Sequence, residues 1–106
     1  MAVDELLKKV KAHLVIEHDV DDELITRLII SALDYAESFQ HKKSGAYKKK
    51  NAMTPSTEQA VIMLSSHYYE SRDGSTGGFF ADNVNASQQV WNTVNRLLRL
   101  DKDWGI

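Results

Sequence analysis

The chain contains no cysteine and only one proline among its 106 residues. Without cysteine it can form neither a disulfide nor a thiolate metal site, and it suits a reducing compartment. No apolar run approaches the roughly 18 residues that a membrane span requires. Residues 1–9 also lack the apolar stretch of a signal peptide. We therefore expect neither membrane insertion nor export.

An excess of charge of either sign is also missing. Thirteen Lys and Arg face 15 Asp and Glu, which gives a formal net charge of −2. This balance creates no global attraction to nucleic acid or membrane, so any electrostatic role must come from a local patch. A hydrophobic content of 42% is ordinary for a globular protein. The length predicts a single domain, residues 1–106.

Motifs for catalysis and metal binding are absent from the sequence. It has no H-E-x-x-H, G-x-S-x-G, P-loop or dinucleotide fingerprint. His13 and His18 are separated by an expected helix end, so they cannot share a helix face. The acids of residues 19–23 lack the glycine and distal glutamate of a calcium loop and favour a helix start instead. We expect no catalytic residue, no metal site and no cofactor.

Apolar residues recur with helical spacing in four stretches, and no confident strand appears. This pattern predicts an all-α fold, a small bundle with a long second helix and two flexible loops. The helices are expected within residues 4–14, 21–40, 53–73 and 86–100. The loops are a basic segment, residues 41–52, and a glycine-rich segment, residues 73–85.

Capping residues mark the expected helix starts. Thr54 can serve as an N-cap, and Pro55 suits the first helical position because its missing N–H costs nothing there. Asp19 or Asp21 is the expected N-cap of the long helix. Asn85 is the expected N-cap of the last helix, with a glutamine three residues later.

The stretch 53–73 has the densest mixture of apolar and aromatic residues in the chain. A helix that is apolar over so much of its circumference is expected to be central, with partners on more than one side. Its main face comprises Ala60, Val61, Leu64, His67 and Tyr68.

The basic segment contains five lysines and no acid: Lys42, Lys43, Lys48, Lys49 and Lys50. One interpretation is an exposed, solvated loop. The other is a loop that contacts a phosphate backbone or an acidic partner. Tyr47 is the one aromatic residue in this segment, and it would weakly support base stacking.

Aromatic residues also occur outside the expected helices. Phe79 and Phe80 are adjacent in the glycine-rich segment, where they either fold back onto the core or dock on a neighbouring subunit. Trp104 lies near the end of the chain and is either a packed clasp or a subunit contact.

The order of two longer motifs is informative. D-V-D-D-E-L-I-T-R-L-I-I-S-A-L-D-Y-A-E-S-F follows the first short helix, and T-P-S-T-E-Q-A-V-I-M-L-S-S-H-Y-Y-E-S-R-D follows the basic segment. In this order and spacing the chain resembles the gp6-like head-tail connector, or DNA-packaging adaptor, family of tailed bacteriophages and prophages. The family signature near the end of the second motif comprises His67, Tyr68, Tyr69, Glu70 and Arg72.

The resemblance implies a structural virion protein rather than an enzyme. Such proteins form a ring under the capsid portal, roughly twelve-fold, that joins head to tail and extends the DNA channel. Implied partners are further copies of the chain, the portal protein and a tail or stopper protein, with non-specific contact to packaged DNA. The implied location is the head-tail interface of the virion, after assembly in the bacterial cytoplasm.

A cyclic ring needs two different adhesive faces on each subunit. The candidate interface residues are Tyr35, Phe39, Phe79, Phe80, Leu100 and Trp104. The lysines of the basic segment are candidates for lining the DNA channel or for docking on the portal.

Two other classes of protein remain as alternatives. A small helical nucleic-acid-binding or regulatory protein would use the lysines together with Arg96 and Arg99. The slightly negative net charge and the lack of a basic recognition helix argue against it. An enzyme would have only the group around His67 and Glu70 to offer.

Overall fold

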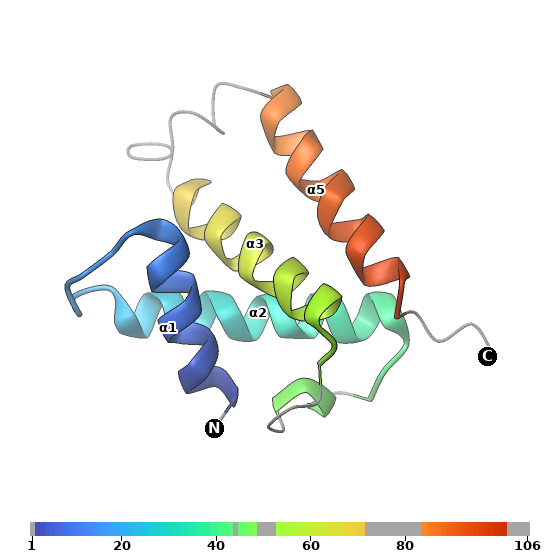
Figure 1. The fold of residues 1–106 in the computed structure, drawn as a ribbon, viewed down its shortest axis with the longest axis horizontal. Coiled ribbons are helices and arrows are strands. Elements are labelled where there is room, and N and C mark those ends of the chain that lie inside the picture. Colours follow the sequence, from blue (N-terminus) through green and yellow to red (C-terminus); the bar gives the residue numbers. More distant parts are fainter. Residues whose placement is uncertain (1, 44, 49–52, 72–83, 102–106) are drawn as a thin grey trace.

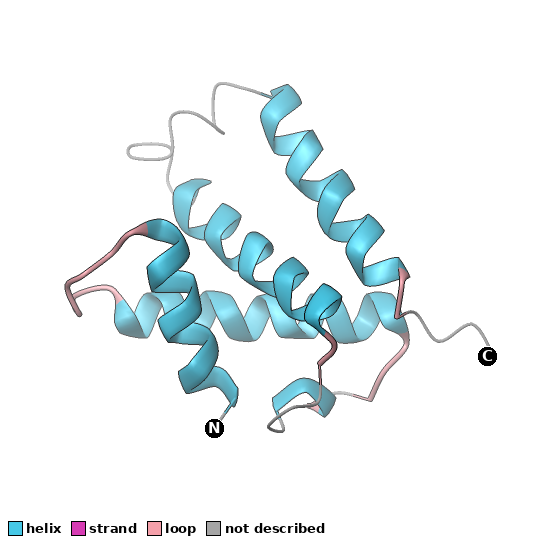
Figure 2. Ribbon diagram, viewed as in Figure 1, coloured by secondary structure: helices cyan, strands magenta, loops and turns pink. Residues whose placement is uncertain are grey.

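The computed structural model describes residues 2–43, 45–48, 53–71 and 84–101. These ranges contain four α-helices and one short 3₁₀ helix, and they contain no strand (Figure 2). The elements are α1 (Ala2–Leu14), α2 (Asp22–Gln40), η1 (Ala46–Lys48), α3 (Pro55–Ser71) and α5 (Val84–Arg99). The all-α prediction is confirmed.

Helix α3 is the centre of the arrangement. It crosses in front of α2, with α1 on one side and α5 on the other, and it runs opposite to α5 (Figure 1). It makes contacts with all three of these helices. Its buried residues accordingly lie on more than one face: Thr57, Ala60, Val61, Ile62, Leu64, Ser65, Ser66 and His67. The expectation of a central helix is confirmed.

One cluster of buried side chains joins the helices. Helices α1 and α2 contribute apolar residues at helical spacing, as their sequences predict, and α5 contributes two residues one turn apart. Burying each large aliphatic side chain contributes about 1.5–3 kcal/mol. The buried apolar residues are Val3, Leu6, Val10, Ile25, Ile29, Ala32, Leu33, Ala36, Tyr47, Ala60, Val61, Ile62, Leu64, Val94 and Leu98.

The predicted start of α3 is confirmed in detail. The Thr57 N–H donates to Thr54 Oγ1 at 3.3 Å, and the Glu58 N–H donates to the Thr54 carbonyl at 2.9 Å. Pro55 is the first residue of the helix. Thr54 therefore caps α3 as its sequence position indicates.

The other two capping predictions are wrong in part or whole. Asp21 occupies the N-cap position of α2, but its side chain makes no capping hydrogen bond. Its carboxylate accepts a hydrogen bond from the Tyr69 hydroxyl instead. Helix α5 begins at Val84, so Asn85 already has helical backbone and cannot be the N-cap, which requires a non-helical conformation.

Helices α1 and α2 end in the same way. Val15 (φ 59°) and His41 (φ 61°) follow them in the left-handed region. The Ile16 N–H donates to the Lys11 carbonyl at 2.9 Å, and the Lys42 N–H donates to the Glu37 carbonyl at 2.8 Å. This pattern satisfies carbonyls that a helix end leaves without partners and turns the chain sharply.

Leu64 tests the central position of α3, because its side chain is fully buried. We expect Leu64→Ala to lower the free energy of unfolding by about 2–5 kcal/mol, through lost burial and the cavity that remains. Ser31→Ala, at an exposed position of α2, is the control and should change it by less than about 0.5 kcal/mol. Urea denaturation measures both, and equal effects would contradict the assigned core.

Candidate functional site

The basic segment is anchored to α2 through Glu37. This side chain is buried, and its two carboxylate oxygens accept hydrogen bonds from the Gly45 N–H and the Tyr47 N–H, both at 2.9 Å. Gly45 has φ 84°, a conformation that side chains rarely adopt, so glycine suits this position. The segment is thus held at its middle by a carboxylate.

Tyr47 lies in the core, which corrects the expectation that it stands in an exposed loop. Its side chain is only 5% exposed, and its hydroxyl donates to Gln40 Oε1. Burial raises the pKa of the phenol. The ring is therefore not available for base stacking. A short segment without periodicity has no sequence feature that would have indicated this burial.

Gln40 connects the same end of the bundle to α3 and α5. Its fully buried amide nitrogen donates to Thr57 Oγ1 at 3.0 Å and to the Leu98 carbonyl at 2.8 Å. The Thr57 hydroxyl donates in turn to Asp101 Oδ2 at 2.7 Å, and the Thr54 hydroxyl donates to the same oxygen. A continuous polar network therefore fixes where the basic segment starts and where the chain leaves α5.

The remaining candidate residues are placed only in part. Lys42 and Lys43 are exposed, directly after α2, and Lys48 is the last residue of η1. Leu100 follows α5 and is 69% exposed. Lys49, Lys50, Phe79, Phe80 and Trp104 lie outside the described residues.

Tyr35 and Phe39, two candidate interface residues, are half-buried on α2. The Tyr35 hydroxyl donates to Asn95 Oδ1 at 2.6 Å, and its ring meets the edge of Trp91 with centroids 5.3 Å apart. Phe39 packs partly against the core, with its ring 6.1 Å from that of Tyr35. Tyr35 thus joins α2 to α5 within the subunit, and an intersubunit role for the pair stays a prediction.

The signature residues of α3 divide into packing groups and exposed groups. His67 is buried, and Tyr68 is half-buried; their rings lie 5.9 and 6.1 Å from Trp91 of α5. Tyr69 bonds to Asp21 at the start of α2. Glu70 is exposed. The aromatic members therefore fasten α3 to its neighbours.

Arg72 completes the predicted signature, but it lies outside the described residues. Its part in the signature therefore stays a prediction.

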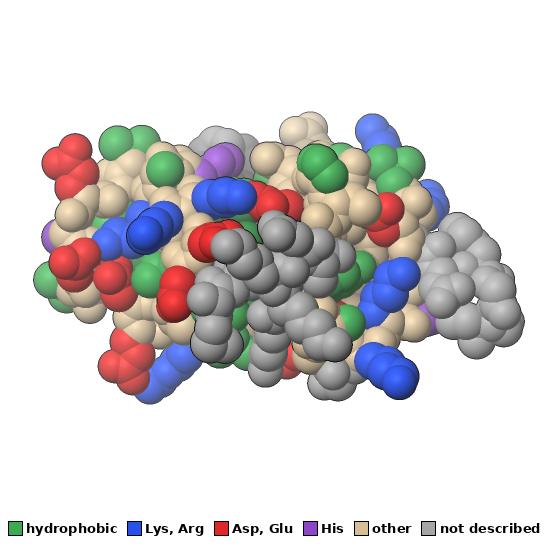
Figure 3. All heavy atoms as spheres, turned by 60° about the horizontal axis from the view of Figure 1, so that its bottom comes forward, with side chains coloured by type: hydrophobic (Ala, Val, Ile, Leu, Met, Phe, Trp, Pro, Cys, Tyr) green, Lys and Arg blue, Asp and Glu red, His purple; other side chains and the backbone are tan. Residues whose placement is uncertain are grey.

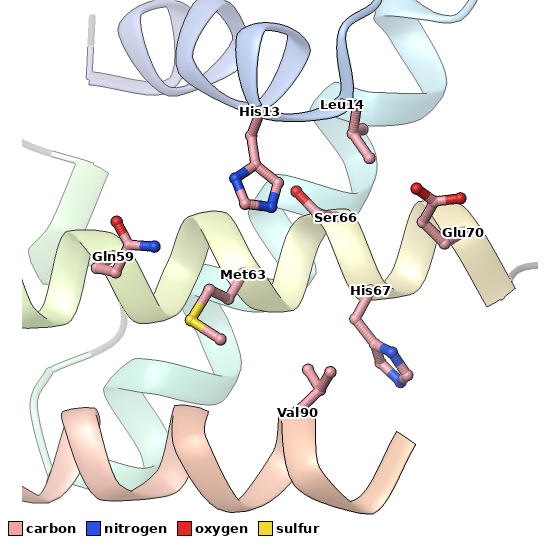
Figure 4. Close-up of a pocket in the computed structure, with 8 residues that line it drawn as sticks. All are labelled: His13, Leu14, Gln59, Met63, Ser66, His67, Glu70 and Val90. Atoms are coloured by element: carbon pink, nitrogen blue, oxygen red, sulfur yellow. The ribbon is translucent and has the colours of Figure 1, made fainter. Parts of the chain in front are cut away.

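A pocket of about 260 Å³ lies beside this group, between α1, α3 and α5 (Figure 4). Ser66 and Glu70 point from α3 toward α1, whereas His67 points toward α5. Neighbouring helical residues diverge in this way, so Ser66 and His67 are not arranged as a nucleophile and its base. The polar groups of the pocket do not converge on one reacting atom.

Two further searches of the described ranges bear on function. Within them, no three His, Asp or Glu side chains are grouped so that they could hold a metal ion. No helix there is long and apolar enough to cross a membrane.

The described residues thus form a small helical bundle, held together by helix packing and by anchored connecting segments. A family model for the phage gp6-like head-tail connector protein matches residues 4–102. The chain belongs to this family, whose members have a structural role at the junction of phage head and tail. No curated protein and no solved structure gave a match.

Glu37 tests the anchoring of the basic segment. We expect Glu37→Ala to lower the free energy of unfolding by about 1–3 kcal/mol, because two backbone N–H groups lose a charged acceptor. Trypsin should also cleave after Lys42 and Lys43 faster than in the parent chain. Glu23→Ala, which removes an exposed pair with Arg27, is the control, with an expected change below about 1 kcal/mol. Unchanged proteolysis of Glu37→Ala would refute the anchor.

His67 gives a pH dependence of defined sign. Burial lowers the pKa of its imidazole below the ordinary 6.5. Between the lowered native value and 6.5 the unfolded chain binds more protons than the native one, so stability falls as pH falls through this window. Thermal melts of His67→Gln should lose this part of the pH dependence, whereas His13→Gln, at an exposed position, should keep it. A slope that His67→Gln leaves unaltered would exclude His67 as its source.

Proposed function

We propose that the chain, acting as one domain, assembles into a ring that docks under the capsid portal. This ring would extend the DNA channel and offer its lower surface to a tail or stopper protein. The protein would be present in the bacterial cytoplasm during assembly and at the head-tail interface of the virion. The observation that carries the proposal is the family match over residues 4–102.

The packing of the subunit supports a structural role of this kind. Helix α3 contacts the other three helices, and the polar network of Gln40 and Thr57 joins the ends of α2, α3 and α5. Interiors packed in this way are stiff and transmit strain. A ring that carries a packaged genome above and a tail below benefits from such stiffness.

The basic segment is the proposed contact surface for DNA or for the portal. Lys42 and Lys43 are exposed next to the anchored η1, so their backbone is positioned by Glu37 and Tyr47. Repeated around a ring, these lysines would create a positive band. Such a band would screen phosphates without reading sequence, or would pair with acidic groups of the portal.

Replacement of the five lysines of the segment (Lys42, Lys43, Lys48, Lys49 and Lys50) by glutamine tests both roles. If the band faces DNA, filled heads should lose packaged DNA more readily, and the salt dependence of DNA retention should decrease. If the band faces the portal, portal binding should weaken, with DNA retention altered only as a result. The control replaces Lys8, an exposed lysine of α1. Unchanged retention together with unchanged portal binding would remove both roles.

Electron microscopy of the purified protein, alone and mixed with its portal, tests the ring itself. We expect rings in solution or a ring bound under the portal. A protein that does neither under any condition would refute the connector mechanism. A salt-sensitive gel shift of duplex DNA by the isolated monomer would favour a nucleic-acid-binding function instead.

A further inference from the structure

The α1–α2 connection carries two apolar side chains that face solvent. Val15 is 82% exposed and Val20 is 85% exposed. Among the described residues only one other large apolar side chain is exposed to a comparable degree, Leu100 at 69%. The connection and the end of α5 lie at opposite ends of the long axis of the molecule (Figure 1).

Val15 also has an unfavourable backbone conformation. Its φ of 59° lies in the left-handed region, where a β-branched side chain is strained and glycine or asparagine is preferred. His41 closes α2 in the same conformation, but histidine is a tolerated residue there. The hydrogen bond from the Ile16 N–H to the Lys11 carbonyl compensates this strain within the subunit, but the exposed Val15 side chain adds no packing there. A contact outside the subunit would add it.

The connection is held in place before any such contact forms. The Lys11 ammonium lies 2.8 Å from a carboxylate oxygen of Asp19 and 2.8 Å from one of Asp22. The Val20 N–H donates to His18 Nδ1 at 3.3 Å. These contacts order the α1–α2 connection in the free subunit. Binding through Val15 and Val20 therefore costs less conformational entropy.

The two ends of the molecule also differ in charge. Residues 17–23 contain five acids and no lysine or arginine. Exposed basic side chains lie at the other end: Lys42, Lys43, Arg96 and Arg99. Figure 3 shows acidic side chains, with some basic ones between them, at the end with the α1–α2 connection, and mainly basic side chains at the opposite end. The exposed valines have acidic residues around them, and the exposed Leu100 has basic residues around it. The two apolar surfaces are therefore complementary in charge.

We propose that the α1–α2 connection of one subunit docks on the end of α5 of a second copy, with Val15 and Val20 against Leu100. The surrounding acids then face Lys42, Lys43 and Arg99. Because the two surfaces differ, the contact is heterologous and repeats from subunit to subunit until it closes. This assignment rests on the proposed ring and names the two faces that build it.

Cysteine cross-linking tests the pairing directly, since the chain has no cysteine of its own. Under mild oxidation, the double variant V20C/L100C should give a ladder of dimers, trimers and larger species. Each single variant should give dimers at most. The matched control S31C/L100C places the first thiol at an exposed position in the middle of α2 and should give no ladder.

A second variant separates association from folding. Val15→Asn relieves the left-handed strain, so we expect the Tm of the monomer to rise by a few degrees. Association between subunits should weaken by about tenfold or more, the factor expected from one lost valine contact. Ser31→Asn introduces the same side chain elsewhere and should leave association unchanged. Sedimentation analysis measures the association.

The outcomes distinguish this assignment from the ring itself. Rings of normal appearance without a V20C/L100C ladder, and with Val15→Asn associating as the parent does, would overturn the assignment and leave the ring standing. Normal self-association of Val15→Asn with loss of portal binding would also overturn it, since the connection would then bind the portal. Failure of the parent chain to form any ring would refute the proposed function and this assignment together.

Discussion

Gln40 carries a side-chain amide without access to water, so its polar atoms must find partners within the protein. Both N–H groups and the carbonyl oxygen do so, with Thr57, Leu98 and Tyr47. An unsatisfied buried group of this kind costs about 1–3 kcal/mol. The ends of α2, α3 and α5 and the short helix η1 must therefore reach their places together, which makes this end of the bundle cooperative.

The other side of the bundle is held by aromatic rings rather than by a polar network. Trp91 of α5 receives Tyr35 from α2 together with His67 and Tyr68 from α3. Edge-to-face contacts of this kind favour defined orientations beyond simple burial. Packing between helices therefore accounts for the dense aromatic motif at the end of α3, which fits a structural connector family.

Local features of the sequence were good guides where structure depends on neighbours along the chain. Helical periodicity predicted the four helices, and Thr54 with Pro55 predicted the start of α3. The sequence did not predict burial where the hydrogen-bond partner of a side chain is distant along the chain. The buried Tyr47 hydroxyl has its acceptor in Gln40 Oε1. The buried Gln40 amide nitrogen has its acceptor in the carbonyl of Leu98, 58 residues away.

The candidate site follows the same division. Lys42 and Lys43 were recognised from composition and are exposed, but nothing in the composition indicated that Glu37 fixes the backbone after them. Asp19 or Asp21 is the N-cap that the sequence predicts for α2; Asp21 holds that position, yet its side chain accepts from the Tyr69 hydroxyl, 48 residues away, instead of capping the helix. The exposed valines of the α1–α2 connection have no pattern of their own, because exposure and a positive φ are properties of the folded chain.

The anchoring of Tyr47 and Thr54 has a consequence for how such a protein can diversify. Both residues are held by hydrogen bonds to the bundle, Tyr47 through Gln40 and Thr54 through Asp101 and the first turn of α3. Tyr47 and Thr54 therefore fix the two ends of the stretch between them. Lengthening a chain between fixed ends costs little, only about 0.6 kcal/mol for each doubling. Proteins with this fold can thus change the length and sequence of this stretch to suit a different partner, while the packing of the helices is retained.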